Sequence, residues 1–183
     1  IKKYLIIKPV KEILINIDNI DMIDLKNEYE NFEFDLVYLL IGGYKTNAGS
    51  IAQLIHQSHP DCKFLFTPWM KTPVILETTG DVINNCIMPS HYPPRGVSTN
   101  VDDYVKEFKN KFGIAPTSIS LNVYTALEII HQAILKGYSK PNEIKSFIDS
   151  QRNFNTNFGK ITFNSFGDVD APLYFINDIP KEF

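Results

Sequence analysis

Three short segments place aromatic and polar side chains directly after predicted strands. One of them contains the only tryptophan of the chain, Trp69. The carboxyl ends of parallel strands meet at one edge of a sheet, and ligands bind beyond that edge. Aromatic walls with a few polar groups suit a small-molecule pocket, although the tyrosines could equally cap the sheet. The segments predict a ligand site formed by Gly43, Tyr44, Lys45, Thr67, Trp69, His91 and Tyr92.

The first of these segments belongs to a glycine-containing loop, residues 42–50, between a predicted strand and a predicted helix. A phosphate loop would occupy this position, but its closing Gly-Lys-Ser/Thr is absent, as is Gly-x-Gly-x-x-Gly. Backbone N–H groups at a helix start can still hold an anionic group such as a carboxylate. The loop is therefore either a contact for a small ligand or a plain tight turn.

His56, His59 and Cys62 have a spacing that resembles a metal site. A structural zinc site needs four ligands, and no fourth candidate stands nearby. Histidines in the last turn of a helix also interact favourably with its dipole. We expect no metal and no cofactor. Cys62 and Cys86 could pair in an oxidising compartment or remain as buried thiols.

Composition excludes several classes of function. The net charge is −3, and only Arg95 and Arg152 are arginines among 18 Lys and Arg residues, which does not suit a nucleic-acid surface. No apolar run approaches a membrane span. Neither Gly-x-Ser-x-Gly nor His-Glu-x-x-His occurs. We therefore expect a soluble protein that binds a small ligand without transforming it, and no enzyme.

The elements that would position the site alternate between strand and helix in the first part of the chain. Residues 12–17 (EILINI) are rich in β-branched residues, and residues 35–41 (DLVYLLI) are continuously apolar, as in a strand covered on both faces. Such alternation predicts an α/β fold, a parallel sheet with helices on both faces. Further strands are expected at 63–66 and 82–88, with helices at 21–32, 47–59 and 73–79.

The part of the chain after Pro93-Pro94-Arg95-Gly96 has a different pattern. Helices are expected at 101–112, 118–135 and 141–148, and strands at 160–163 and 172–176 would form a C-terminal β-hairpin through Gly167-Asp168. The helix at 118–135 is apolar on most of its circumference, which is typical of a helix buried on more than one side.

Five stretches follow one another in an order that is more specific than any one of them. They are FDLVY followed by GGY (34–38, 42–44), KFLFTPW (63–69), residues 80–93, FKNKFGIAP followed by YTAL (108–116, 124–127), and FGKITF followed by FGD (158–163, 166–168). In this order they resemble the type I periplasmic solute-binding proteins, the group that contains the branched-chain amino acid receptors of ABC transporters.

The resemblance implies a periplasmic or extracellular receptor that binds a small molecule in an interlobe cleft for an ABC permease or a sensor. It covers the C-terminal half of such a protein, with an α/β ligand-binding lobe at 1–94, a helical crossover at 95–158 and a hairpin returning to the lobe at 159–183. The helices would need a missing N-terminal half or a second copy to cover them. A non-transporting sensor or interaction domain that dimerises is the alternative. Amino-acid receptors of the family carry an acidic residue in the loop matching 67–70, and its absence here speaks against an amino-acid ligand.

Overall fold

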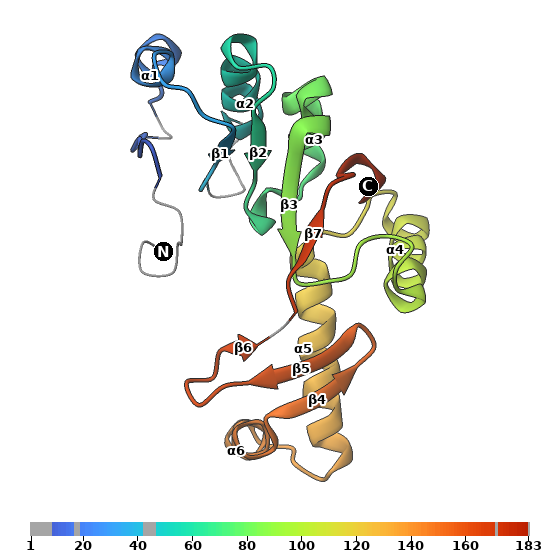
Figure 1. The fold of residues 1–183 in the computed structure, drawn as a ribbon. Helices are drawn as coiled ribbons and strands as arrows, with labels where there is room; N and C mark the ends of the chain where they lie inside the picture. Colours follow the sequence, from blue (N-terminus) through green and yellow to red (C-terminus); the bar gives the residue numbers. More distant parts are fainter. Residues whose placement is uncertain (1–8, 17–18, 42–46, 171, 183) are drawn as a thin grey trace. The chain divides into compact units, whose positions relative to one another are not determined.

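The structure is a computed structural model, and it describes residues 9–16, 19–41, 47–170 and 172–182 (Figure 1). The chain divides into two compact units, Ile1–Ile87 and Met88–Phe183. The sequence-based division into a lobe at 1–94, a crossover at 95–158 and a hairpin at 159–183 describes parts of a complete receptor. That division stays a prediction.

The first unit is built around parallel strands connected by helices, which confirms the predicted α/β class. Val37, Phe64 and Cys86 lie opposite one another on successive strands. Its elements are α1 (Met22–Tyr29), β1 (Leu36–Tyr38), α2 (Asn47–Ser58), β2 (Lys63–Leu65), η1 (Pro68–Met70), α3 (Pro73–Thr79), η2 (Gly80–Asn85) and β3 (Cys86–Ser90), the last of which runs across the boundary between the units.

Local sequence explains two features of this unit. Asp21 begins α1 because its carboxylate accepts hydrogen bonds from the backbone N–H groups of Ile23 and Asp24, at 2.8 and 3.2 Å. Gly49 lets α2 and α3 approach closely, since a Cβ at this position would lie 2.5 Å from the carbonyl carbon of Thr78.

Two sequence predictions in this unit are wrong. The segment 12–16 forms no strand, because a strand needs a neighbour for its backbone hydrogen bonds and no described strand pairs with it. The strand expected at 82–88 begins only at Cys86, since residues Gly80–Asn85 form a 3-10 helix.

Strand β1 is exposed on one side. Leu36, Tyr38 and Leu40 are 53%, 46% and 57% exposed, whereas Leu39 and Ile41 are buried. Side chains alternate between the two faces of a strand, so these three share one face. The described residues therefore leave this face of β1 uncovered.

The second unit contains three helices and short antiparallel strands. Its elements are α4 (Thr99–Phe112), α5 (Ser118–Leu135), α6 (Pro141–Gln151), β4 (Asn153–Thr156), β5 (Gly159–Phe163), β6 (Val169–Asp170), β7 (Tyr174–Ile176) and η3 (Pro180–Glu182). The predicted turn at Gly167-Asp168 is present, but it joins β5 to β6. The final strand instead pairs antiparallel with the end of β3, so the expected pairing of 160–163 with 172–176 is wrong.

Two hydrophobic clusters hold the second unit together. The first contains five buried residues, and the second contains four, with Phe154 only 1% exposed. Aromatic rings meet mostly edge to face, as between Phe147 and Phe154 at 5.8 Å. The members are Tyr92, Val101, Val105, Leu121 and Phe158 in the first cluster and Ile129, Ala133, Phe147 and Phe154 in the second.

Helix α5 buries one face and exposes another. Leu121, Thr125, Ile129 and Ala133 are buried. The opposite side carries five apolar side chains at helical spacing that are 37–60% exposed, which we call the α5 stripe: Ile119, Val123, Leu127, Ile130 and Ile134. An exposed apolar patch of this size usually marks an interface.

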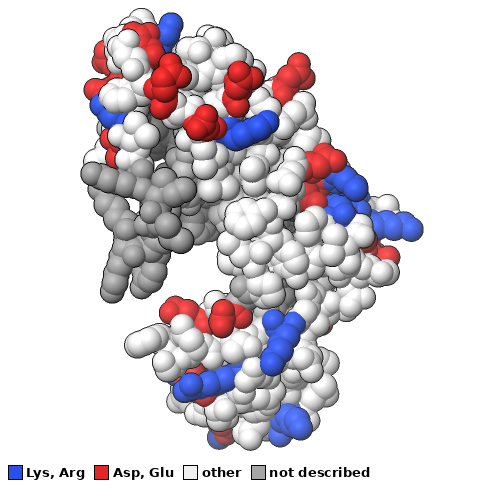
Figure 2. All heavy atoms as spheres, in the orientation of Figure 1, with Lys and Arg blue, Asp and Glu red and all other residues white. Residues whose placement is uncertain are grey.

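The surface also shows how charge is distributed. On the face drawn in Figure 2, Lys and Arg side chains lie among Asp and Glu, separated by wide areas that carry neither. Among the described residues, no helix has the length and apolar composition needed to cross a membrane.

Candidate functional site

Trp69 lies where the sequence predicts, just beyond the carboxyl end of β2. It occupies the middle of η1, between half-buried Pro68 and buried Met70, and its side chain is 62% exposed. A large aromatic side chain held on a short, anchored turn and left open to solvent is suited to stack on a ligand. The exposed position leaves Trp69 open to contact with a ligand, and that contact stays a prediction.

Thr67 anchors the turn that carries Trp69. The residue is fully buried, and its hydroxyl donates a hydrogen bond to the carbonyl of Ile41, with 3.1 Å between the oxygens. This bond ties the end of β2 to the segment that follows β1. The only proton of the hydroxyl is thus already used within the protein, so Thr67 positions the site and could offer a ligand only an acceptor.

Tyr92 is 7% exposed and belongs to the first cluster of the second unit. Its ring meets Phe158 edge to face at 5.8 Å, and its hydroxyl donates to Asn122 at 2.6 Å. Burial raises the pKa of this hydroxyl. These contacts occupy the ring that was predicted to enclose a ligand, so we assign Tyr92 to the support of the segment after β3.

His91 is exposed, and Ser90 beside it is buried with its hydroxyl bonded to the carbonyl of Tyr92 at 2.8 Å. Gly43, Tyr44 and Lys45 lie outside the described residues. Trp69 and His91 belong to different units, and each therefore remains a separate candidate.

Of the two histidines with metal-like spacing, His59 makes hydrogen bonds, while the buried Nδ1 of His56 has no hydrogen-bond partner among the described residues. His59 uses both ring nitrogens, one with the Ser58 hydroxyl and one with the Phe32 carbonyl, each at 3.0 Å. Its ring also stacks on Phe34 at 4.3 Å. No group of His, Cys, Asp or Glu within the described residues has the geometry of a metal site.

Cys62 and Cys86 are both buried as free thiols. Burial raises the pKa of Cys62 to about 11 and that of Cys86 to about 12, because a thiolate would lose its hydration. Cys62 donates to the carbonyl of Lys63 at 3.3 Å, and Cys86 donates to that of Val82 at 3.3 Å. Both thiols therefore remain protonated and weakly nucleophilic at neutral pH.

The second unit has an apolar groove of about 400 Å³ between α5 and α6. Its polar lining is limited to Lys145 and Asp149, which form an ion pair with each other. Ile130 of the α5 stripe lines it together with Pro141, Ile144 and Ile148. The groove has few polar groups to orient a small ligand, and it continues the apolar surface of α5.

Sequence reasoning missed a set of polar contacts around the segment after β3. Asp102 accepts hydrogen bonds from the guanidinium of Arg95 at 2.7 Å and from the backbone N–H of Gly96 at 3.0 Å. Glu182, which is 4% exposed, accepts one from the backbone N–H of Arg95 at 2.8 Å. These contacts order the connection into α4. No sequence pattern links Arg95 to Glu182. The only local signal is Asp102, because an acidic residue in the first turn of a helix commonly marks its N-terminus.

Comparison with known proteins identifies the fold. Leucine-binding protein LivK of Thermotoga maritima is 22% identical, with a TM-score of 0.69 over 87% of this chain. LivJ of Streptococcus pneumoniae, solved with isoleucine, is 16% identical, with a TM-score of 0.69 over 85%. A solute-binding protein of R. palustris, solved with benzoate, is 15% identical, with a TM-score of 0.71 over 92%.

These likenesses show the type I periplasmic-binding-protein fold, as the sequence predicts. The matches cover only 46%, 44% and 46% of the three solved chains, so this chain spans less than half of their length. No protein-family model matches the chain, and no curated protein sequence matches it.

Proposed function

We propose that this chain forms one lobe region of a solute-binding receptor that presents a small carboxylate to an ABC permease or a sensor. The observation that carries the proposal is Trp69, an exposed aromatic on an anchored turn at the carboxyl end of β2 in this fold. Such a receptor binds its ligand in a cleft between lobes, closes around it and leaves it chemically unchanged. It would work in the periplasm or outside the cell.

An aromatic carboxylate fits this site better than an amino acid. The turn Thr67-Pro68-Trp69-Met70 offers no acidic group for an ammonium, while its exposed indole ring can stack on an aromatic ligand. Two solved proteins of this fold were crystallised with benzoate and with 3,4-dihydroxybenzoic acid. In this proposal, Gly43, Tyr44 and Lys45 of the loop before α2 add polar contacts around the carboxylate, while His91 stays a separate candidate in the second unit.

The α5 stripe is the surface that a first lobe would cover. Its side chains are Ile, Val and Leu, which suit the face of a sheet, and the matched proteins contain more than half of their length outside the matched region. A dimerising interaction domain of the same fold is the second candidate, and the same exposed stripe favours it.

Saturation-transfer-difference NMR tests ligand binding, because it detects weak complexes of an incomplete site. We expect benzoate and 3,4-dihydroxybenzoate to give difference signals and leucine to give much weaker ones. Trp69→Leu should remove the benzoate signal. Phe112→Leu, which alters an equally open aromatic on α4, is the matched control and should preserve it.

Equal signals for leucine and benzoate would refute the proposed ligand class. A benzoate signal that survives Trp69→Leu would refute the role of Trp69. If no small carboxylate gives a signal, the interaction domain becomes the better account.

A further inference from the structure

The connection between β3 and α4 contains a tight turn at residues 94–97. A hydrogen bond from the Val97 N–H to the Pro94 carbonyl, at 3.1 Å, closes it. Gly96, the third residue of the turn, has φ of 82°, the conformation that a type II turn requires at this position. One side of the turn is held by Asp102 in the first turn of α4, whose carboxylate accepts from the Gly96 N–H and from the Arg95 guanidinium.

The other side of the 94–97 turn is held by a segment far away in the sequence. Residues 177–182, which we call the η3 strap, follow β7 and include η3. The Glu182 carboxylate accepts a hydrogen bond from the Arg95 N–H at 2.8 Å. Glu182 is 4% exposed and Ile179 is 0% exposed, whereas the other four residues of the strap are exposed. The strap is therefore attached through two buried side chains.

The backbone of the η3 strap adds little to this attachment. Its hydrogen bond from the Glu182 N–H to the Ile179 carbonyl, at 3.0 Å, lies within the strap. In the described part of the chain, no backbone-to-backbone hydrogen bond joins the strap to another segment. A segment with few buried side chains and few such hydrogen bonds opens at low cost in free energy.

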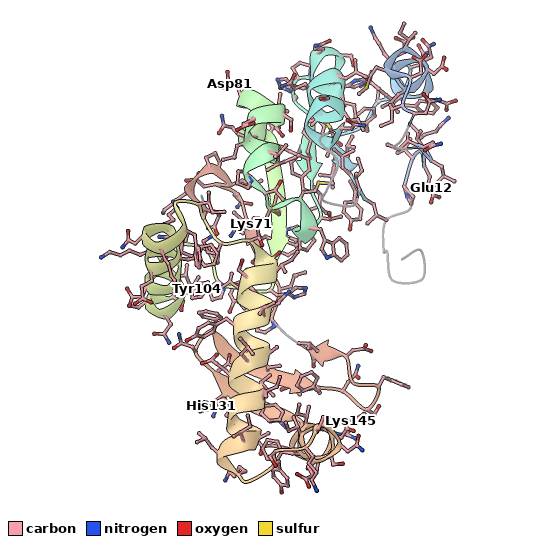
Figure 3. All side chains as sticks on the ribbon, turned by 180° about the vertical axis from the view of Figure 1, so that it is seen from behind. Glu12, Lys71, Asp81, Tyr104, His131 and Lys145 are labelled. Carbon is pink, nitrogen blue, oxygen red and sulfur yellow. The ribbon has the colours of Figure 1, made fainter. Side chains whose placement is uncertain are left out.

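Helix α4 is packed through residues of its own. Val101 and Val105 are buried in the first cluster. Tyr104, labelled in Figure 3, lies on the side of α4 that faces α5, and its hydroxyl donates to the Ser120 carbonyl at 3.4 Å. Opening of the η3 strap would therefore leave α4 and the contacts of Asp102 in place.

We propose that the η3 strap is a conformational device that opens from the 94–97 turn as a local unit, while both hydrophobic clusters stay packed. Glu182 sets how often the strap opens. In the open state the Arg95 N–H is released, and the turn keeps only the support of Asp102. The connection into α4 thereby loosens at a defined point without unfolding of the second unit. The inference concerns the second unit alone and does not depend on ligand binding.

Amide hydrogen exchange, followed by NMR on the 183-residue chain, tests the proposal. Neighbouring amides report the two sides of the turn separately, because the Arg95 N–H bonds to Glu182 and the Gly96 N–H bonds to Asp102. In the unchanged chain, low concentrations of urea should leave exchange at Arg95 constant. They should accelerate exchange at Ile129 in the middle of α5, because only global unfolding exposes enough surface to depend on urea.

Substitutions then assign the opening to Glu182. Glu182→Ala should accelerate exchange at Arg95 about tenfold to a hundredfold, as expected for the loss of a hydrogen bond to a charged group, and leave Gly96 unchanged. Asp102→Ala should do the reverse. Glu182→Gln keeps an acceptor oxygen and should give an intermediate rate at Arg95. Asp178→Ala removes an exposed carboxylate of the same strap, so it is the matched control and should change neither amide.

Three results would overturn the proposal. If Arg95 and Ile129 show the same dependence on urea in the unchanged chain, the strap opens only when the whole unit unfolds. If Glu182→Ala accelerates Gly96 as much as Arg95, the strap and the turn do not open separately. If Asp178→Ala acts as strongly as Glu182→Ala, the buried carboxylate does not hold the strap. The first comparison needs no variant, so it stands even if a substitution prevents folding.

Discussion

The α5 stripe predicts that the isolated chain self-associates. Its five side chains are 37–60% exposed, which together corresponds to about two and a half fully exposed apolar side chains. Complete burial of one such side chain stabilises by about 1.5–3 kcal/mol, so covering the stripe is worth about 4–7 kcal/mol before the costs of association. A dimer buries the stripe of both copies, so the gain doubles to about 8–14 kcal/mol, and the groove beside α6 adds to the contact. We therefore expect association at micromolar concentration.

Replacing Val123 and Leu127 with glutamine tests this reasoning. The two residues are 54% and 60% exposed, so the change removes slightly more than one fully buried side chain, or about 1.5–3 kcal/mol per copy. Sedimentation velocity should show the wild-type chain as species larger than 20.9 kDa. The double variant should raise the dissociation constant about tenfold or more.

A matched control changes two apolar residues outside the stripe. Val97 and Phe166 are 67% and 89% exposed, and their replacement with glutamine should leave association unchanged. Monomeric wild-type protein at micromolar concentration would refute the prediction. So would an equal effect of both double variants, because association would then not use the stripe.

Two substitutions and two measurements on the unchanged chain probe the interior. Phe154→Ala removes a side chain that is 1% exposed, and it should cost about 3–5 kcal/mol of unfolding free energy in a urea titration. Gly49→Ala should destabilise strongly and broaden thermal unfolding, because the new Cβ meets the backbone of Thr78. At pH 7, Cys62 and Cys86 should react with a thiol reagent only on unfolding; rapid labelling of the native chain would contradict their burial. Because their pKa values are raised in the folded state, stability should be unaffected below about pH 9 and fall as the pH rises toward 11–12, as measured by melting temperature.

Helices with clear caps and periodicity could be predicted closely from the sequence. The expected bounds of α3 and α5 agree with the structure, and Gly113 ends α4 in the left-handed conformation, with φ of 74°. Strands were harder to predict from the sequence, because a strand forms only where a neighbouring strand pairs with it. Residues 12–16 have the composition of a strand but pair with no described strand, and β7 pairs with β3 instead of β5.

The residues proposed for the ligand site differ widely in their burial. Trp69 and Thr67 both follow β2, yet Trp69 is exposed and Thr67 buried, because the burial of Thr67 and Tyr92 depends on tertiary contacts that no local pattern reveals. The Thr67 bond to Ile41 spans 26 residues, and the Glu182 bond to Arg95 spans 87. Contacts this distant in sequence are set by the fold, so spacing alone could not identify them.

Native mass spectrometry of the purified protein tests the central claim most directly, because it reports ligand and assembly in one spectrum. With benzoate added, the account predicts a complex that retains the carboxylate and contains either more than one 20.9 kDa chain or a partner polypeptide. Trp69→Leu should lose the carboxylate and keep the assembly. A bare 20.9 kDa monomer that retains no small molecule, in the presence of benzoate, would contradict the account.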